Sequence, residues 1–175
     1  HRYQMKRGTA LEFQHMVTSS DFITVLGDYD CDGMTATYIM VRLCHNKFQK
    51  QTDFLIPNRF SDGYGISNDL VDRIYEDKKP MIESGKVCTI ITVDNGIAGE
   101  EAIKHATELG FRVIVTDHHE MLGNCPDADL VIDPKVKECN PFEYDGYCGA
   151  GVAYKIAEQF IEDPKVLTHL GCFAA

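Results

Sequence analysis

The strongest constraint on this sequence is the regular alternation of strand-like and helix-like segments. Apolar residues recur at helical spacing between the strand-like runs, for example from Met34 to Phe48. This alternation predicts an α/β domain, with a parallel β-sheet flanked by helices on both faces. The apolar, β-branched runs of strand type are residues 22–26, 52–56, 87–93, 111–116 and 130–132.

Helix boundaries are indicated by capping and breaking residues. Ser67 has the side chain of an N-cap, and Gly110 follows the last apolar residue of another helical stretch. We therefore expect helices at residues 9–17 and 34–48, directly after Ser67, and at 98–109 and 152–161.

The chain has 175 residues, enough for one domain with a substantial core. We expect a helical lead-in at residues 1–20, the main α/β domain at 21–163, and the start of a continuation at 164–175. No apolar run reaches the length of a membrane span, and the first residues lack the apolar stretch of a secretory signal. These features predict a soluble, cytoplasmic protein without membrane contact.

Composition excludes some classes of site and leaves others open. The 7 cysteines are odd in number and form no CxxC pair, which argues against a disulfide framework and a structural zinc site. The formal net charge of −10 argues, taken alone, against nucleic-acid binding. However, bound cations reduce the negative charge of an acidic cluster, so the net charge does not exclude an anionic ligand.

Three of the predicted strands run directly into acidic residues. The first strand continues into Gly27-Asp28-Tyr29-Asp30-Cys31-Asp32-Gly33, the third into Asp94-Asn95-Gly96, and the fourth into Asp117-His118-His119. The carboxyl ends of parallel strands lie along one edge of the sheet, where open α/β folds bind ligands. If the first loop is extended, its three alternating carboxylates face one cavity, and Gly33 then turns the chain into its helix.

The negative charge of such a cluster must be compensated by positive groups. Carboxylates a few ångströms apart repel each other by several kcal/mol at an effective dielectric constant of about 20. Few basic residues are near, since Arg112 lies at the far end of its strand. Aspartate and imidazole ligands suit Mn²⁺ and Mg²⁺, so the sequence predicts a site for two divalent cations.

Each element of this pattern also has a simpler explanation. The first loop resembles the start of a calcium-binding loop, but Ile39 occupies the twelfth position, where that motif needs a glutamate. A single aspartate after a strand, such as Asp94, is often a turn former or a helix cap. Adjacent histidines are often surface residues. The metal site is favoured because three strands end in this way.

The sequence also resembles a known family, the DHH phosphoesterase superfamily, whose signature matches Asp117-His118-His119. Within the superfamily, the RecJ group of single-strand exonucleases is the most similar. The matching segments occur in the order of the family and are Val25–Gly33, Ile56–Phe60, Gly63–Gly65, Ile91–Gly96, Val113–His119 and Gly149–Ala153.

This resemblance implies a metal-dependent exonuclease acting on single-stranded nucleic acid, with DNA favoured over RNA. It implies 5′-to-3′ digestion and a role in DNA repair or recombination. Two ions, Mn²⁺ or Mg²⁺, would share Asp94. The implied metal ligands are Asp28, Asp30, Asp32, Asp94 and His118, and the implied catalytic residues are Asp117 and His119.

The loop at residues 58–65 contains the expected substrate contacts, Asn58 and Arg59. A guanidinium forms bidentate hydrogen bonds to phosphate, and the alternative for Arg59 is a salt bridge with Asp62. Tyr64 has two expected roles, stacking on a base or packing in the turn.

The sequence departs from the family in two places. Leu26 stands where many relatives have a histidine, and a further metal-binding aspartate of the family is expected beyond Ala175, with a second domain that holds the substrate. Two alternatives stay open: a phosphodiesterase for cyclic dinucleotides or short oligonucleotides, and an inactive RecJ-like scaffold. The visible ligand positions all keep an acid or a histidine, which favours an enzyme.

Overall fold

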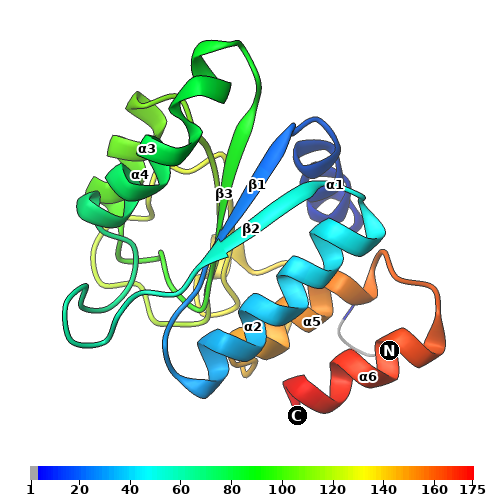
Figure 1. Ribbon diagram of the computed structural model, residues 1–175. Helices are drawn as coiled ribbons and strands as arrows, with labels where there is room; N and C mark the ends of the chain where they lie inside the picture. The colour runs from blue at the N-terminus through cyan, green and yellow to red at the C-terminus, as the bar shows by residue number, and fades with distance from the viewer. Residues whose placement is uncertain (1–3) are drawn as a thin grey trace.

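The computed structural model describes residues 4–175, which form a five-stranded, all-parallel sheet with the strand order β2-β1-β3-β4-β5 (Figure 1). The predicted α/β class is therefore confirmed. The strands are β1 Phe22–Leu26, β2 Gln51–Leu55, β3 Cys88–Val93, β4 Arg112–Thr116 and β5 Leu130–Ile132.

Helices cover both faces of the sheet, as predicted. α1, α2, α5 and α6 pack on one face, and α3 and α4 pack on the other (Figure 1). A π-helical segment, Leu43–Lys47, continues α2, and a short 3₁₀ helix, Lys137–Cys139, follows β5. The α-helices are α1 Arg7–Thr18, α2 Cys31–Arg42, α3 Asn68–Glu83, α4 Glu100–Glu108, α5 Gly149–Glu158 and α6 Pro164–Ala174.

The central strand β3 divides the core into two layers. Ile91 and Val93 pack on the side of α2 and α5, whereas Cys88 and Ile90 pack on the side of α3 and α4. All six residues of β3 are buried, which explains its continuous run of Val, Ile and Thr. Because β3 lies between β1 and β4, the carboxyl ends of these three strands are adjacent at one edge of the sheet.

The start of α2 differs from the prediction. The expected extended loop through residue 32 is wrong, because α2 already begins at Cys31 and Asp32 lies in its first turn. Asp30 is the N-cap, and its side chain accepts a hydrogen bond of 2.7 Å from the N–H of Gly33. This local bond stabilises a helix start by about 1 kcal/mol, which favours helix over extended backbone.

Gly33 also permits close packing at this point. A Cβ atom on Gly33 would lie 2.4 Å from the Cβ of Asp28, so a side chain here would push the two segments apart. Gly33 therefore allows α2 to pack closely against the loop that follows β1.

Other differences are small shifts at element ends. Ser67 caps α3 as predicted, with its side chain accepting from the N–H of Leu70. Ala98 precedes α4 instead of opening it, and the last predicted helix starts earlier, at Gly149. The predicted helix at residues 9–17 is α1, while residues 1–3 of the predicted lead-in lie outside the described residues.

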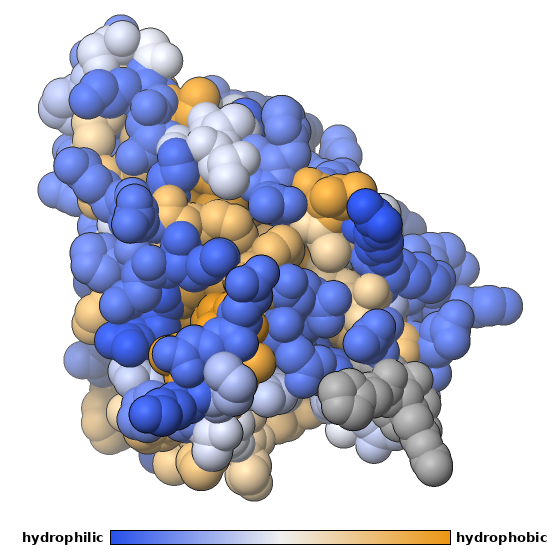
Figure 2. Space-filling model, turned by 90° about the vertical axis from the view of Figure 1, so that its right-hand side faces the viewer, coloured by the Kyte–Doolittle hydropathy of each residue, from blue (hydrophilic) through white to orange (hydrophobic). Residues whose placement is uncertain are grey.

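The surface agrees with a chain that exposes mainly polar groups. On the face shown in Figure 2, polar side chains predominate and apolar side chains gather in a hollow near the centre. Among the described residues, none of the helices combines the length and the apolar character needed to cross a membrane.

Candidate metal centre

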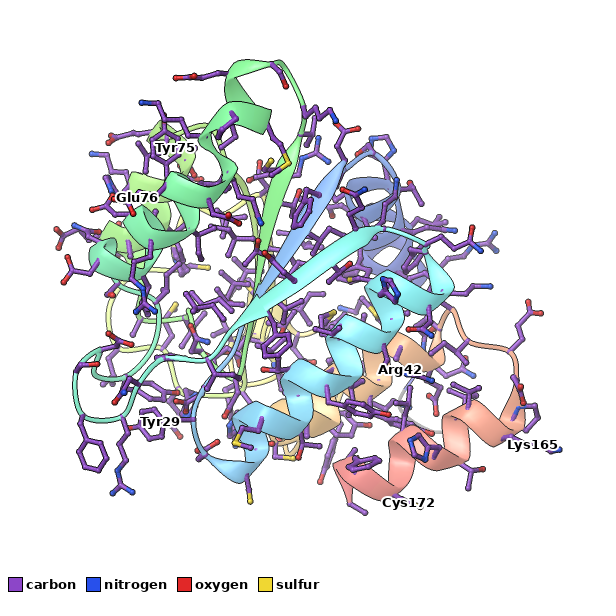
Figure 3. The ribbon with its side chains drawn as sticks, viewed as in Figure 1. Tyr29, Arg42, Tyr75, Glu76, Lys165 and Cys172 are labelled. Carbon is purple, nitrogen blue, oxygen red and sulfur yellow. The ribbon has the colours of Figure 1, made fainter. Side chains whose placement is uncertain are left out.

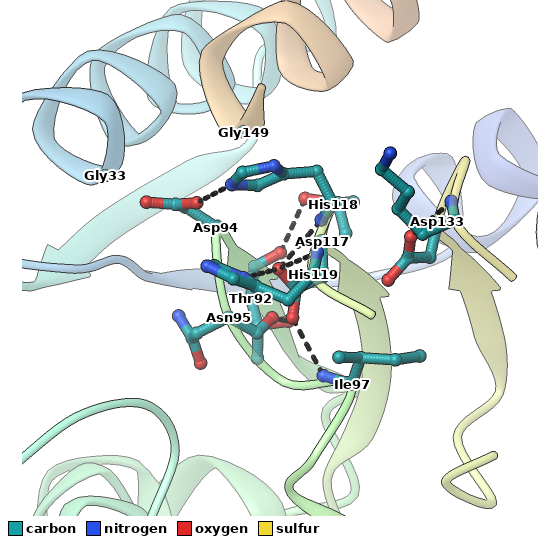
Figure 4. A network of polar contacts seen from close by, with 12 residues as sticks. Gly33, Thr92, Asp94, Asn95, Ile97, Asp117, His118, His119, Asp133 and Gly149 are labelled. Carbon is teal, nitrogen blue, oxygen red and sulfur yellow. Dashed lines mark hydrogen bonds and ion pairs between the residues drawn. The ribbon is translucent and has the colours of Figure 1, made fainter. Parts of the chain in front are cut away.

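The acidic residues after β1, β3 and β4 meet at the carboxyl edge of the sheet. Figure 4 shows those that follow β3 and β4, Asp94 and Asp117. Strand register determines this arrangement, because Thr92 of β3 lies opposite both Leu26 of β1 and Val115 of β4. Asp28, Asp94 and Asp117 follow these strands within two residues and are almost fully buried. Tyr29, at the lower side of the view in Figure 3, is next to Asp28 in the same loop.

Two groups of potential metal ligands share one residue. Oxygen atoms of Asp28, Asp30 and Asp94 all lie within 4.8 Å of one another, and so do ligand atoms of Asp94, His118 and His119. Asp94 is thus placed between two sets of donors. Carboxylate and imidazole donors suit Mn²⁺, and among residues 4–175 the buried Oδ1 atom of Asp94 has only one close polar partner, Nε2 of His118, itself a potential ligand. The residues at this edge therefore fit a divalent cation.

Asp94 is held in an unusual backbone conformation. Its φ angle is +58°, in the left-handed region, which costs of order 1–3 kcal/mol for a residue with a side chain. The hydroxyl of Tyr64 donates a hydrogen bond of 2.9 Å to the carbonyl oxygen of Asp94. The tertiary structure thus holds Asp94 where its side chain faces both ligand groups.

The Asp94 carboxylate is destabilised by its surroundings. Burial raises the pKa of Asp94 to about 6, although His118 acts to lower it from a distance of 2.8 Å between Nε2 and Oδ1. Asp94 in turn is the main cause of the raised pKa of His118. Burial also raises the pKa of Asp28. A cation at this position would relieve the unfavourable carboxylates.

Asn95 has a role that the sequence analysis missed. Its side chain is fully buried and donates hydrogen bonds to the carbonyl oxygens of Leu26, Gly27 and Val93, at 3.1, 3.2 and 3.0 Å. Its Oδ1 accepts from the N–H of Ile66. Asn95 therefore joins the ends of β1 and β3 to the loop at residues 58–66. Its position two residues after a strand, next to Asp94, was the available signal.

Asp117 lies outside both ligand groups, and its carboxylate accepts hydrogen bonds from nearby backbone N–H groups. One oxygen accepts from the N–H of Ile97 at 3.0 Å, and the other accepts from the N–H of His118 at 2.8 Å. That second oxygen also lies 2.6 Å from Nδ1 of His119. This contact is the largest cause that raises the pKa of His119 to about 9, so His119 is protonated at neutral pH.

Asp32 also lies outside the two ligand groups. Its two oxygens accept hydrogen bonds from the N–H groups of Gly149 and Ala150, at 2.8 and 2.7 Å. Burial acts to raise the pKa of Asp32, but these two N–H groups lower it. His118 is 3.4 Å away.

The predicted substrate contacts lie on the exposed loop at residues 58–65. Asn58 shapes a turn, with its side chain accepting from the N–H of Phe60 at 2.9 Å. Asp62 pairs with Arg73 at 3.1 Å instead of with Arg59. Within residues 4–175, the Arg59 guanidinium forms no salt bridge or side-chain hydrogen bond, so it is available to an external anion.

A cavity of about 370 Å³ opens beside His119. Tyr64 lines it, and the Tyr64 hydroxyl lies 3.1 Å from Nδ1 of His119. Gly96, Ile97 and Leu122 also line this cavity. The cavity places a partly apolar space directly next to the ligand groups.

Asp133 is a further strand-end acid that the sequence analysis missed. It follows β5 directly and is fully buried, and its Oδ1 accepts from the N–H of Lys135 at 2.8 Å. Its Oδ2 has no hydrogen-bond partner among residues 4–175. Burial raises the pKa of Asp133 to about 7 against the effect of that N–H. The rule that identified the other acids also applied here, to Ile132-Asp133.

Comparison with known proteins identifies the family. The family model described as "DHH family, N-terminal domain" matches residues 22–174. This chain belongs to the DHH family.

Relatives of this DHH domain are longer proteins. The chain is 39% identical over 132 residues to the single-stranded-DNA-specific exonuclease RecJ of Escherichia coli K12, covering 75% of this chain and 21% of the relative. It is 35% identical over 161 residues to the Bacillus subtilis 168 protein of the same name, covering 91% and 19%. The chain thus spans about a fifth of the length of these curated relatives.

Solved structures support the same fold. A crystal structure of exonuclease RecJ bound to manganese matches with a TM-score of 0.70 and 27% identity, covering 96% of this chain and 41% of that one. RecJ from Thermus thermophilus in complex with Mn²⁺ matches with a TM-score of 0.65 and 25% identity, covering 97% and 24%.

We expect the Asp117→Asn substitution to lower the pKa of His119 from about 9 toward its ordinary value of 6.5, because the carboxylate stabilises the imidazolium. NMR titration of the histidine ring protons in the metal-free DHH domain measures this change. Asp127→Asn, which removes an exposed carboxylate, is the control and should leave His119 unchanged. The same His119 pKa in both variants would contradict the assignment to Asp117.

We expect Asp133→Asn to stabilise the metal-free domain above neutral pH. The ordinary pKa of 3.8 applies to the unfolded chain, whereas the folded protein keeps the proton until about pH 7. Wild-type stability therefore falls, relative to the variant, as pH rises through this interval. Thermal unfolding between pH 4 and 8 should show a difference that is smallest at pH 4. A constant difference across this range would be contrary to the prediction.

Proposed function

We propose that this domain is the metal-binding catalytic part of a phosphodiesterase that removes nucleotides from single-stranded DNA with two divalent cations. The observation that carries this proposal is the position of Asp94, which belongs to both groups of ligand atoms. A carboxylate shared between two ions is the usual core of a two-metal hydrolytic site.

The residues divide into two sides around Asp94. Asp28 and Asp30 supply oxygen ligands on one side, and His118 supplies a nitrogen ligand on the other. Mn²⁺ and Mg²⁺ both accept such ligands, and His118 favours Mn²⁺. When bound, such ions polarise the phosphoryl oxygens and lower the pKa of a coordinated water.

His119 and Asp117 act on the charge that develops during hydrolysis. Asp117 fixes the His119 ring through the contact of 2.6 Å and keeps it protonated. The imidazolium is then ready to donate a hydrogen bond to a phosphoryl oxygen, where negative charge increases in the transition state. The His119 ring lies within 4.8 Å of ligand atoms of Asp94 and His118, so its position next to the reacting phosphate agrees with this role. The proposal requires no serine or cysteine nucleophile.

Substrate binding is assigned to the loop at residues 58–65. The unpaired guanidinium of Arg59 is suited to a backbone phosphate, and Asn58 shapes the turn that presents it. On the same loop, the Phe60 side chain is 94% exposed and Tyr64 lines the cavity beside His119. Exposed aromatic rings next to a cationic side chain are typical of single-strand binding by stacking.

The comparisons support the choice of substrate. Relatives 35–39% identical to this domain are single-stranded-DNA-specific exonucleases, and two similar structures contain manganese. For this protein we propose a preference for DNA over RNA, digestion in the 5′-to-3′ direction, and a role in DNA repair or recombination. Since the domain covers about a fifth of these relatives, substrate grip by a further domain is part of the proposal.

We expect Asp94→Asn to abolish high-affinity Mn²⁺ binding, because it removes a charged ligand from both sides of the site. Isothermal titration of the domain with MnCl₂ measures the affinity and the number of ions. Asp127→Asn removes the same charge from an exposed position and should bind as the wild type does. Equal binding by the wild type and Asp94→Asn would reject the shared-ligand role.

We expect Arg59→Ala to raise the KM for single-stranded DNA about 10-fold with a smaller effect on kcat, since a charge-assisted hydrogen bond to phosphate is lost. Nucleotide release from a labelled oligonucleotide in MnCl₂ provides the assay, using a protein that carries the complete substrate-binding region. Lys165→Ala is the charge-matched control, because Lys165 lies in the first turn of α6, on the opposite side of the view from Tyr29 (Figure 3). Faster cleavage of a cyclic dinucleotide than of the oligonucleotide would overturn the proposed substrate.

A further inference from the structure

The first turn of α5 contacts the metal centre through its backbone. Gly149 donates its N–H to Oδ2 of Asp32 at 2.8 Å, and Ala150 donates its N–H to Oδ1 at 2.7 Å. The first N–H groups of a helix have no partner within the helix, and they carry partial positive charge. A single carboxylate from α2 therefore satisfies two of these groups, across 117 and 118 residues of sequence.

Gly149 also lies against Asp94, the residue shared by the two ligand groups. A Cβ atom on Gly149 would lie 2.6 Å from both Cβ and Oδ1 of Asp94 and 2.7 Å from Cγ. Separations below 3.0 Å are not tolerated by real Cβ atoms, and Asp94 is buried and held by Tyr64. Figure 4 shows Gly149 above the Asp94 carboxylate, close to His118.

Gly151, two residues further along the same helix, provides a contrast. A Cβ atom on Gly151 would meet Tyr147 at 3.4 Å and the Sγ of Cys148 at 3.6 Å, which are ordinary contacts. A side chain is therefore excluded at Gly149, whereas the Gly149-Ala150-Gly151 turn has room for one at Gly151.

The rest of α5 is firmly packed. Val152, Ala153 and Ile156 are fully buried in the core layer that also contains α2. The helix cannot move away from the sheet edge without opening this layer, so its first turn forms a fixed wall beside Asp94.

We propose that Gly149 is a positioning residue of the metal centre and that Asp32 anchors the helix turn that carries it. Asp32 anchors the first turn of α5, and the missing side chain of Gly149 leaves the space in which the Asp94 carboxylate stands between the two ligand groups. The inference rests on the proposed function for the shared role of Asp94.

The role of Asp32 is tested without metal, by comparing Asp32→Asn with Asp28→Asn in thermal unfolding with a chelator present. An anchor loses charge-assisted hydrogen bonds to α5, so Asp32→Asn should lower the unfolding midpoint. Asp28 accepts a hydrogen bond from the adjacent Tyr29 N–H and contacts no distant element in this way, so its neutralisation removes like-charge repulsion and should not lower the midpoint. An unchanged or raised midpoint for Asp32→Asn overturns the anchor role.

The role of Gly149 is tested by comparing Gly149→Ala with Gly151→Ala. Both substitutions raise helix propensity equally, so they differ mainly in the contact with Asp94. We expect Mn²⁺ affinity, measured by calorimetry, to fall about 10-fold or more for Gly149→Ala, the size of effect seen when a metal ligand loses its supporting contacts. Gly151→Ala should stay within about 2-fold of the wild type.

If Gly149→Ala does not fold, Ala150→Pro replaces it. Proline is tolerated in the first turn of a helix, and this variant removes the N–H that reaches Asp32 Oδ1. It should lower both the unfolding midpoint and the Mn²⁺ affinity, and wild-type values for both would overturn the proposal.

The outcomes separate this inference from the proposed function. Equal Mn²⁺ affinity for the wild type and Gly149→Ala overturns the positioning role and leaves the proposed function intact. A wild-type domain that binds no Mn²⁺ overturns the proposed function, and the role of Gly149 with it, while the metal-free comparison still decides whether Asp32 anchors α5.

Discussion

The parallel register of β1, β3 and β4 brings several carboxylates to one buried edge of the sheet, where their negative charge is separated from water. Asp28 and Asp94 are 1% and 2% exposed, and burial raises the pKa of both. Ionised groups in such surroundings are unfavourable unless hydrogen-bond donors or cations compensate them. Hydrogen-bond donors compensate the charge of some of these carboxylates and not of others, and this difference distinguishes the acids by role.

Two aspartates are stabilised by backbone N–H groups from other elements. Asp117 binds the N–H groups of Ile97 and His118, and Asp32 binds the first turn of α5. In contrast, Oδ1 of Asp94 receives no backbone N–H among residues 4–175, and its one close polar partner there is Nε2 of His118. Backbone N–H groups thus stabilise the charge of Asp117 and Asp32, whereas a cation would compensate the charge of Asp94. A bound cation would reduce the negative charge of this edge, which makes the proposed phosphate substrate compatible with a net charge of −10.

The side chains that surround this centre contact one another. His119 is oriented by Asp117 and contacted by Tyr64, whose hydroxyl also holds the strained backbone of Asp94. The loop at residues 58–65 therefore connects three properties, namely an unpaired guanidinium, exposed aromatic rings and the geometry of the shared ligand.

The sequence by itself determined the α/β class, the strands and the strand ends at which acids meet, because these follow from local periodicity and from the geometry common to parallel sheets. It did not determine the start of α2, where the Asp30 cap competes with extended backbone, nor the buried state of Asp133. Only the tertiary structure decided that Asp32 faces α5, since its partners are more than a hundred residues away. A carboxylate's role depends on the donors that surround it, and those donors come together only when the chain folds.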